Sequence, residues 1–357
     1  MTILPLRHST MQISLTNPPF KTPQIFPFHQ PIFSPKQPNQ LSLQTHVVNS
    51  LKGSGYLSEI SKAIDYEEQY RVAKSQVIRK GLDLEGYSIE GVSIGGHETC
   101  IIIPEFKCAF DIGRCPTRAI HQNFVFITHA HLDHIGGLPM YIGSRGLYNL
   151  KPPTVFVPPC IKDDVEKLLD VHKSLGQVEL NCELVALDVG ETYEIRNDLV
   201  VRPFKTHHVI PSQVSILELT SLVYVVDFGL LPSRTLQCVA DLITDTILSP
   251  EVAFTGDTTS DFMLDPLNAD ALRAKVLITE ATFLDDSTTI EQARQHGHTH
   301  ISELIENAQW IRNKTVLLTH FSSRYNIEDI RQAASKLQSK VSAKVVTLTE
   351  GFKSLYS

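Results

Sequence analysis

Short apolar runs alternate with amphipathic stretches along most of the chain beyond residue 95. Most of these runs are nearly continuous in apolar residues, which is the pattern of strands that are buried on both faces. Strands are predicted over residues 99–103, 107–112, 124–128, 154–157, 252–255, 275–279, 315–319 and 344–348, and amphipathic helices over about 161–175, 300–312 and 327–341. In the second helical window, Ile301, Leu304 and Ile305 fall on one face at helical spacing. Strands layered between helices predict an α/β architecture.

The N-terminal segment has a different composition. The first acidic residue is Glu59, and the 58 residues before it carry four basic side chains and many Pro, Ser, Thr, Gln and Asn residues. Such a segment cannot bury enough apolar surface to fold alone. It resembles an organelle transit peptide, and scarce Arg with abundant Pro favours the plastid over the mitochondrion. We predict a disordered plastid transit peptide over residues 1–60, with a tail that has no targeting function as the alternative. A folded domain over 61–357 would follow, starting with a helix from about Ser61 to Lys80.

Composition narrows the class of protein. Hydrophobic residues make up 42% of the chain, but no apolar run approaches the roughly 18 residues that span a bilayer, so a membrane protein is not expected. The net charge is −7, and it becomes −11 without the first 58 residues, because these carry four basic and no acidic side chains. Bulk positive charge therefore cannot hold a nucleic acid, and a positive centre must come from bound metal. The six cysteines form no CxxC pair, and we expect buried thiols.

The densest cluster of polar residues directly follows one predicted strand. His129, His131, Asp133 and His134 lie within six residues. Such a set cannot be satisfied as core groups without a strong common partner, and a metal ion is the natural one. Alternation places His129 and His131 on the same side of an extended loop, while the other two residues lie where the chain turns into a helix. One segment can therefore serve two adjacent cations, and imidazole with carboxylate favours zinc over calcium or magnesium.

Other predicted strands also end in Thr and are followed by a residue that can bind metal or carry a proton. Carboxyl ends of strands in layered α/β folds point into one crevice, so these groups can converge on the His-rich loop. Taken singly, each is weak, since a lone histidine after an apolar strand is more often a satisfied core residue. The residues concerned are His207 and His208, Asp257, Glu280 and His320.

The order of motifs resembles tRNase Z, the tRNA 3′-endonuclease family of the metallo-β-lactamase superfamily, in its short plant form. The segment HAHLDHIGG at residues 129–137 is similar to the metal-binding motif of the superfamily. The match to the family covers roughly residues 65–213 and 243–357. The motifs that narrow it are FTGDT at 254–258, TEATF at 279–283, GHT at 297–299 and LTHFSSRY at 318–325.

This resemblance implies an αββα four-layer sandwich and two zinc ions per subunit, other divalent ions being possible. One ion would be bound by His129, His131 and His208, the other by Asp133, His134 and His320, with Asp257 bridging the two. The choice of His208 over His207 rests on the family spacing of the residues that follow it.

The resemblance also implies a mechanism. Asp133 would orient or deprotonate the attacking water, and Glu280 with His298 would protonate the departing oxygen. A helix-capping carboxylate and a surface histidine are the alternative interpretations of the last two residues. Arg324 is open between a phosphate-binding residue and an ordinary surface arginine.

The implied activity is removal of the 3′ trailer from precursor tRNA, leaving a 3′-hydroxyl on the tRNA and a 5′-phosphate on the trailer. The expected location is the chloroplast stroma. The expected assembly is a homodimer, in which one subunit grips the tRNA while the other cuts. We place a candidate tRNA-binding arm at about residues 151–181, where Lys162, Lys167 and Lys173 supply the positive charge.

The chain departs from the family between residues 214 and 242. Relatives continue with Gly-Tyr and a basic stretch, whereas Arg234 is the one basic residue in this segment. A strand and a basic loop are therefore in doubt, although strands over 215–219 and 222–226 are compatible with the sequence. The seven expected ligands lie outside the segment. Two alternatives remain: a weakened or inactive metal-binding relative, and another phosphodiesterase of the same fold.

Overall fold

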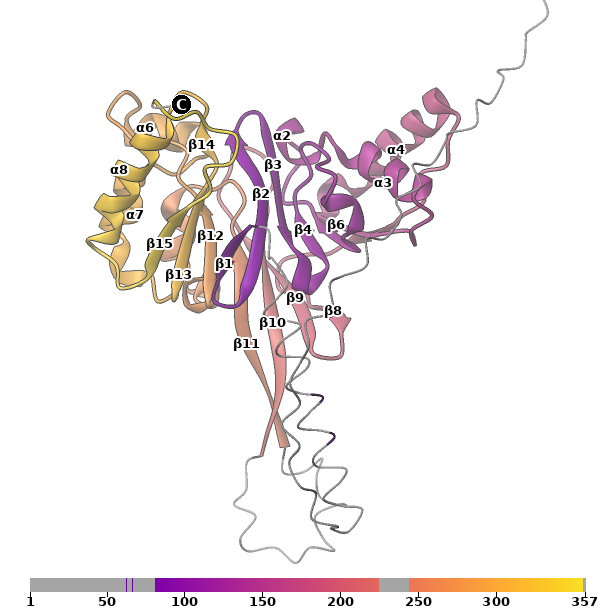
Figure 1. Ribbon diagram of the computed structural model, residues 1–357, viewed down its shortest axis with the longest axis horizontal. Helices are drawn as coiled ribbons and strands as arrows, with labels where there is room; N and C mark the ends of the chain where they lie inside the picture. Colours follow the sequence, from indigo (N-terminus) through magenta and orange to yellow (C-terminus); the bar gives the residue numbers. More distant parts are fainter. Residues whose placement is uncertain (1–61, 63–65, 67–80, 225–243, 356–357) are drawn as a thin grey trace, which may run out of the picture. The chain divides into compact units, whose positions relative to one another are not determined.

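The computed structural model describes residues 62, 66, 81–224 and 244–355, and Figure 1 shows how their helices and strands are arranged. The predicted transit peptide and most of the helix predicted over 61–80 lie outside these residues. Lys62 and Tyr66, the two positions described there, are helical.

The strands form two mixed sheets. The first has the order β1-β2-β3-β4-β5-β6-β7, with β14 paired to β2, and the second has the order β15-β13-β12-β11-β10-β9-β8. The strands of the first sheet are β1 Leu82–Leu84, β2 Tyr87–Gly95, β3 Glu98–Ile103, β4 Cys108–Phe110, β5 Phe124–Phe126, β6 Thr154–Val157, β7 Glu183–Ala186 and β14 Phe321–Ser322. Those of the second are β8 Tyr193–Arg196, β9 Leu199–Lys205, β10 Gln213–Tyr224, β11 Thr244–Phe254, β12 Val276–Glu280, β13 Thr315–Thr319 and β15 Lys344–Thr347.

Helices cover the outer face of each sheet. The α-helices are α2 Leu132–Ile135, α3 Leu138–Leu147, α4 Lys162–Gly176, α6 Ile290–Gln295, α7 Ile301–Glu306 and α8 Ile327–Gln338. Helices α3 and α4 lie on the first sheet, and α7 and α8 lie on the second (Figure 1).

The apolar strands fill three layers of core. In β12, Val276 and Ile278 point between the two sheets, whereas Leu277 points towards the helices of the second sheet. Phe110 of β4 and Phe254 of β11 stack between the sheets with ring centroids 5.1 Å apart. Burial on both faces explains why these strands are continuous in apolar residues. The predicted αββα four-layer sandwich is confirmed.

All eight predicted strands are present, although β11 begins at Thr244 and not at residue 252. The helix predicted over 300–312 is shorter, because α7 ends at Glu306 and a 3-10 helix, Ala308–Trp310, follows. The questioned segment after residue 213 forms β10 as one strand of 12 residues, not two. The pattern missed β1, β2, β7, β8, β9 and β14, several of which are short or alternate with polar residues.

Strands β10 and β11 extend beyond their neighbours in the sheet. β9 pairs with β10 as far as Leu219, and β12 pairs with β11 only at residues 252–254. Residues 220–224 therefore pair with 244–248 as a two-stranded ribbon (Figure 1).

Two expectations from composition can be compared with the structure. In the described part of the chain, no helix is both long and apolar enough to cross a membrane. Cys100 and Cys108 are buried thiols and Cys115 and Cys182 are partly buried, but Cys160 is exposed, so the expectation of buried cysteines is wrong at Cys160. Cys160 lies in the 3-10 helix Pro159–Ile161 that leads into α4, in which no residue is buried. Cys238 lies outside the described residues.

Candidate metal centre

Seven side chains expected to bind metal lie together where strands end and loops begin. Two come from the loop after β5, two from the first turn of α2, and one each from the loops after β9, β11 and β13. They form a first ligand group, His129, His131, His208 and Asp257, and a second ligand group, Asp133, His134 and His320.

In the first ligand group, ring nitrogens face one another. Nδ1 of His131 lies 3.0 Å from Nε2 of His129 and 3.1 Å from Nε2 of His208. Oδ2 of Asp257 lies 3.7 Å from Nε2 of His129. His208 occupies this position, while the neighbouring His207 binds Thr258 through its backbone N–H.

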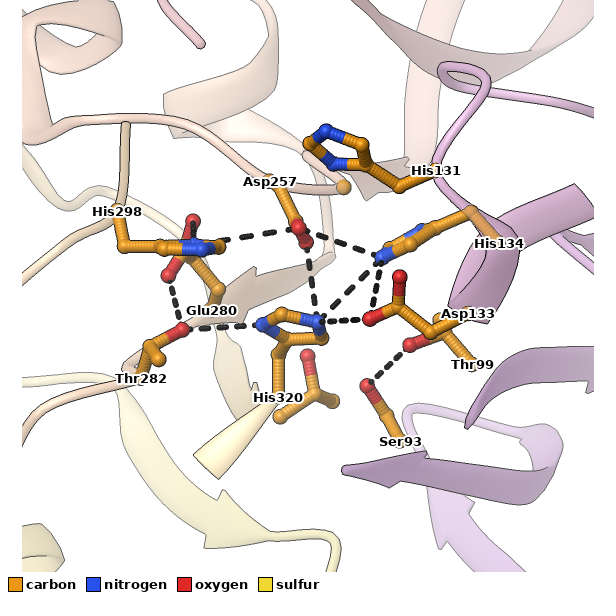
Figure 2. Close-up of polar contacts among 12 residues, drawn as sticks. Ser93, Thr99, His131, Asp133, His134, Asp257, Glu280, Thr282, His298 and His320 are labelled. Atoms are coloured by element: carbon orange, nitrogen blue, oxygen red, sulfur yellow. Dashed lines mark hydrogen bonds and ion pairs between the residues drawn. The ribbon is translucent and has the colours of Figure 1, made fainter. Parts of the chain in front are cut away.

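In the second ligand group, Nε2 of His134 and Nε2 of His320 lie 3.4 Å apart. Oδ2 of Asp133 is 3.6 Å from the first of these nitrogens and 3.5 Å from the second. The two oxygens of Asp257 lie 3.3 Å from His134 and 3.4 Å from His320, so this carboxylate contacts both ligand groups. Figure 2 shows these side chains pointing toward a common centre.

The outer nitrogen of each imidazole fixes its tautomer in the first ligand group. Nδ1 of His208 faces the carbonyl oxygen of Gly297 at 2.8 Å and must donate to it. The hydroxyl of Thr128 donates to the Asp111 carboxylate, so it accepts from Nδ1 of His129 at 2.9 Å. Nε2 of His129 and of His208 therefore points inward as a lone pair.

The same argument applies to the second ligand group. Nδ1 of His134 donates to Oδ2 of Asp111 at 2.8 Å. The Thr282 hydroxyl donates to the Glu280 carboxylate, so it accepts from Nδ1 of His320 at 3.0 Å. In the neutral form of each ring, the Nε2 atom presents a lone pair to the centre.

Four inward lone pairs and two carboxylates cannot satisfy one another by hydrogen bonds. Oδ1 of Asp257 is buried and has no hydrogen-bond partner among the described residues. Burial lowers the pKa of His129 well below its usual value and also lowers those of His131 and His208, which keeps these imidazoles neutral. The donor set therefore fits divalent cations, with imidazole and carboxylate ligands of the kind that zinc prefers.

Backbone geometry supports this arrangement at two positions. Gly297 has a φ of +75°, and a Cβ there would lie 2.5 Å from Nδ1 of His208. Only glycine lets the backbone approach His208 closely enough for its carbonyl oxygen to accept a hydrogen bond from Nδ1. His320 has a φ of 58°, a left-handed conformation that is uncommon for a residue with a side chain and is often found at functional sites.

Glu280 and His298 form a pair beside the centre. Nδ1 of His298 lies 3.2 Å from Oε1 of Glu280, a carboxylate that is 1% exposed. The same carboxylate accepts from the backbone N–H groups of Thr258 and Thr299. The ring of His298 stacks on that of His320 with centroids 5.4 Å apart (Figure 2).

The charge of this pair is set by two opposed effects. Burial alone would lower the pKa of His298, but the Glu280 carboxylate outweighs burial through its charge and its hydrogen bond. The pKa of His298 is therefore raised to about 9. At neutral pH, this histidine carries a proton beside the metal centre.

Asp111 was missed by the sequence analysis, which assigned it to the predicted strand 107–112. It follows β4, is fully buried, and binds both the Thr128 hydroxyl and Nδ1 of His134. One carboxylate thus orients a ligand in each group, directly in the second and through a hydroxyl in the first. A carboxylate within an otherwise apolar predicted strand was the available signal.

A cleft of about 510 Å³ opens beside the centre. It is lined by His131 and His298, by the glycines at 95 and 96, and by Phe283 and Arg324. The lysines of the candidate arm lie elsewhere, on α4, and each pairs with an acidic residue of that helix: Lys162 with Glu166, Lys167 with Asp164 and Lys173 with Asp170. The position of the arm stays a prediction.

Comparison with known proteins gives consistent results. A family model described as the Beta-lactamase superfamily domain matches residues 113–321. The chain is 62% identical over 355 residues to "tRNase Z TRZ2, chloroplastic" of Arabidopsis thaliana, covering 97% of this chain and 100% of that protein. It is 54% identical over 277 residues to "tRNase Z TRZ1" of the same plant, covering 77% and 99%. The metallo-β-lactamase fold protein YhfI of Bacillus subtilis has a similar structure, with a TM-score of 0.52 and 14% sequence identity. The match covers 74% of this chain and 97% of YhfI, and it supports the fold alone.

Proposed function

The chain belongs to the tRNase Z family of the β-lactamase superfamily, and we propose that it is a metal-dependent endoribonuclease that removes the 3′ trailer from precursor tRNA. The tRNA would leave with a 3′-hydroxyl and the trailer with a 5′-phosphate. The name of the relative that is 62% identical supports the chloroplast as its location.

One observation carries this proposal: four imidazole lone pairs and two carboxylates face each other in two groups that share Asp257. We assign two zinc ions per subunit to these groups, one to each. When bound, two such cations lower the pKa of metal-bound water and neutralise negative charge that develops on the phosphate in the transition state. The proposed ligands are His129, His131, His208, Asp257, Asp133, His134 and His320.

Two side chains at the centre would serve the two ends of the reaction, one at the attacking water and the other at the leaving oxygen. Oδ2 of Asp133 accepts a hydrogen bond from the backbone N–H of Gly96 at 2.9 Å, which holds the carboxylate where it can orient the attacking water. His298, kept protonated by Glu280, would give its proton to the 3′-oxygen of the tRNA as the P–O3′ bond breaks. The water oxygen then remains on the trailer phosphate. This assignment accounts for both product ends.

The test compares two substrates of the zinc-loaded full chain. Incubation with a precursor tRNA should give one discrete cut, with a 3′-hydroxyl on the tRNA fragment. Bis(p-nitrophenyl) phosphate reports the chemistry of the centre without any RNA contact. Hydrolysis of this ester with no tRNA cleavage would point to another phosphodiesterase of the fold, whereas stoichiometric zinc with neither activity would point to an inactive relative.

We also propose a homodimer, with the second copy covering the apolar face of α3 and α4. Between these helices lies a groove of about 900 Å³. Leu147 is 86% exposed and Leu175 is 77% exposed at this face, with Met140 and Val178 beside them. Such a patch on a helix pair is typical of a protein interface. Glutamate at Leu147 and Leu175 should convert a dimer into a monomer in sedimentation, and a wild-type monomer would contradict the proposal.

A further inference from the structure

Arg324 lies in the loop between β14 and α8 and lines the cleft beside the metal centre. Two neutral hydroxyls hold its guanidinium: Nε donates to Ser322 at 3.2 Å and Nη1 donates to Ser287 at 3.1 Å. Its Cζ sits 5.2 Å from the centre of the Phe283 ring and 5.6 Å from that of Tyr325. The side chain is thus fixed by contacts with hydroxyls and aromatic rings, and not by direct pairing with a carboxylate.

This setting differs from that of most other arginines in the described part of the chain. Six of them pair with a carboxylate within 4.0 Å: Arg114, Arg118, Arg196, Arg202, Arg273 and Arg294. Asp285 lies near Arg324, but its carboxylate accepts hydrogen bonds from Ser287 and Tyr325. Arg324 instead meets hydroxyls and rings.

A guanidinium has five N–H donors, and Arg324 uses two of them in these contacts. Three remain for a ligand. The chain is acidic, and the carboxylates of Asp133, Asp257 and Glu280 lie in or beside the centre next to this cleft, so an RNA strand needs positive charge at phosphates other than the one being cut. A planar, pre-oriented guanidinium matches the geometry of a phosphodiester.

We propose that Arg324 is the subsite for a phosphodiester next to the scissile one, on the unpaired strand of the precursor RNA. This inference rests on the proposed function. The face of Phe283 and the serine hydroxyls set the direction of the guanidinium, so the contact depends on arginine and not on charge alone. A single contact between a cationic side chain and an RNA phosphate also makes the binding affinity measurably dependent on salt concentration.

The test uses Arg324→Ala and Arg324→Lys in the full, zinc-loaded chain. For precursor tRNA, the alanine variant should raise KM on the order of tenfold, as expected for loss of a charge-assisted hydrogen bond. The slope of log KM against log salt should become shallower by about 0.7, the value of one phosphate contact on a single strand. Lysine should retain the salt slope but recover only part of the affinity. The ratio of kcat/KM for precursor tRNA to that for bis(p-nitrophenyl) phosphate should fall about tenfold in the alanine variant.

Arg331→Ala on α8 is the matched control, since Arg331 is exposed and does not line the cleft. It should leave KM and the salt slope at wild-type values. An equal loss on both substrates with Arg324→Ala would make the residue merely structural and overturn the proposal, as would an unchanged KM. A wild-type enzyme that cuts only the small ester would refute the proposed function. In that case, the affinity of the wild type and of Arg324→Ala for a trailer oligonucleotide is measured at several salt concentrations. A weaker affinity and a shallower salt slope in the variant would support the phosphate subsite, and equal values would overturn it.

Discussion

The two ligand groups of the centre have similar donors but different support. In the first group, the outer partners of the histidines are a hydroxyl and the carbonyl of Gly297. In the second, His134 donates directly to the Asp111 carboxylate. Each group has buried members, His129 and Asp257 in the first and His134 and His320 in the second, but His131 of the first group lines the cleft.

This difference separates two tasks. A carboxylate behind an imidazole makes the ligand more basic and fixes its orientation, so the second group should hold its metal more tightly. The first group, backed by neutral acceptors and open to the cleft, is the side that meets the substrate. Substitutions can test the contrast between the two ligand groups. The first removes the carboxylate that both groups share, and the later ones remove side chains that belong to or support one group alone.

Asp257 should give the largest effect, because its carboxylate is the one ligand that contacts both groups. Asp257→Ala should lower the zinc content from two ions per chain to below one and bring RNA cleavage below detection. Elemental analysis of the purified protein measures this directly. Asp286→Ala, at an exposed aspartate, is the control and should keep both ions. Retention of two zinc ions in the Asp257 variant would show that the groups are independent.

Asp133 belongs to the second group alone. Asp133→Ala should abolish cleavage, since it removes both a ligand and the carboxylate that orients water, yet it should leave the zinc of the first group in place. We expect about half the wild-type zinc content by elemental analysis. Loss of both ions would break the distinction between the groups, and full activity would exclude Asp133 from the mechanism.

The sequence was most informative where chemistry is dense over a short distance. The residues at 129–134 demand a common partner whatever the fold, and the strand-end positions of Asp257 and His320 follow from a general property of layered sheets. The α/β architecture followed from continuous apolar strands that need cover on both faces. The arrangement as a four-layer sandwich and the choice of ligands for each ion, in contrast, came from the family resemblance.

The outer partners could not be predicted in this way. Asp111 reaches Thr128 and His134 because β4 and β5 pair side by side, and that contact is not visible in a local pattern. The role of the Thr282 hydroxyl likewise depends on which neighbour takes its proton. Short strands such as β1 and β8 carry too few residues for their alternation to be distinguished from a loop.

Glu280 should give the next largest effect, because it tunes the proton donor that stacks on the second group. The pKa of His298, raised to about 9, means that its protonated fraction falls as the pH rises through that value. The rate should therefore decline above pH 9 in the wild type. Glu280→Gln removes the negative charge, so the decline should move to lower pH and kcat should fall by roughly 10²–10⁴-fold. A pH–rate profile with the same alkaline limb in both proteins would exclude this pair as the acid.

Asp111 should give the smallest effect and the sharpest test of the contrast between the groups. In Asp111→Asn, an amide N–H₂ would face the N–H of His134, so that ring would lose its acceptor and its fixed orientation. The zinc affinity of the second group should fall by roughly 10–100-fold, the usual cost of removing an outer partner. Thr128→Val, which removes the hydroxyl behind His129, is the counterpart and should weaken zinc binding by the first group.

Chelator titration resolves the two ions. Excess zinc should restore activity if the variant still folds, which its thermal unfolding would report. Equal weakening of both ions by Asp111→Asn would mean that its contact through Thr128 matters as much as its direct one, and the two groups would then share their support as well as their carboxylate.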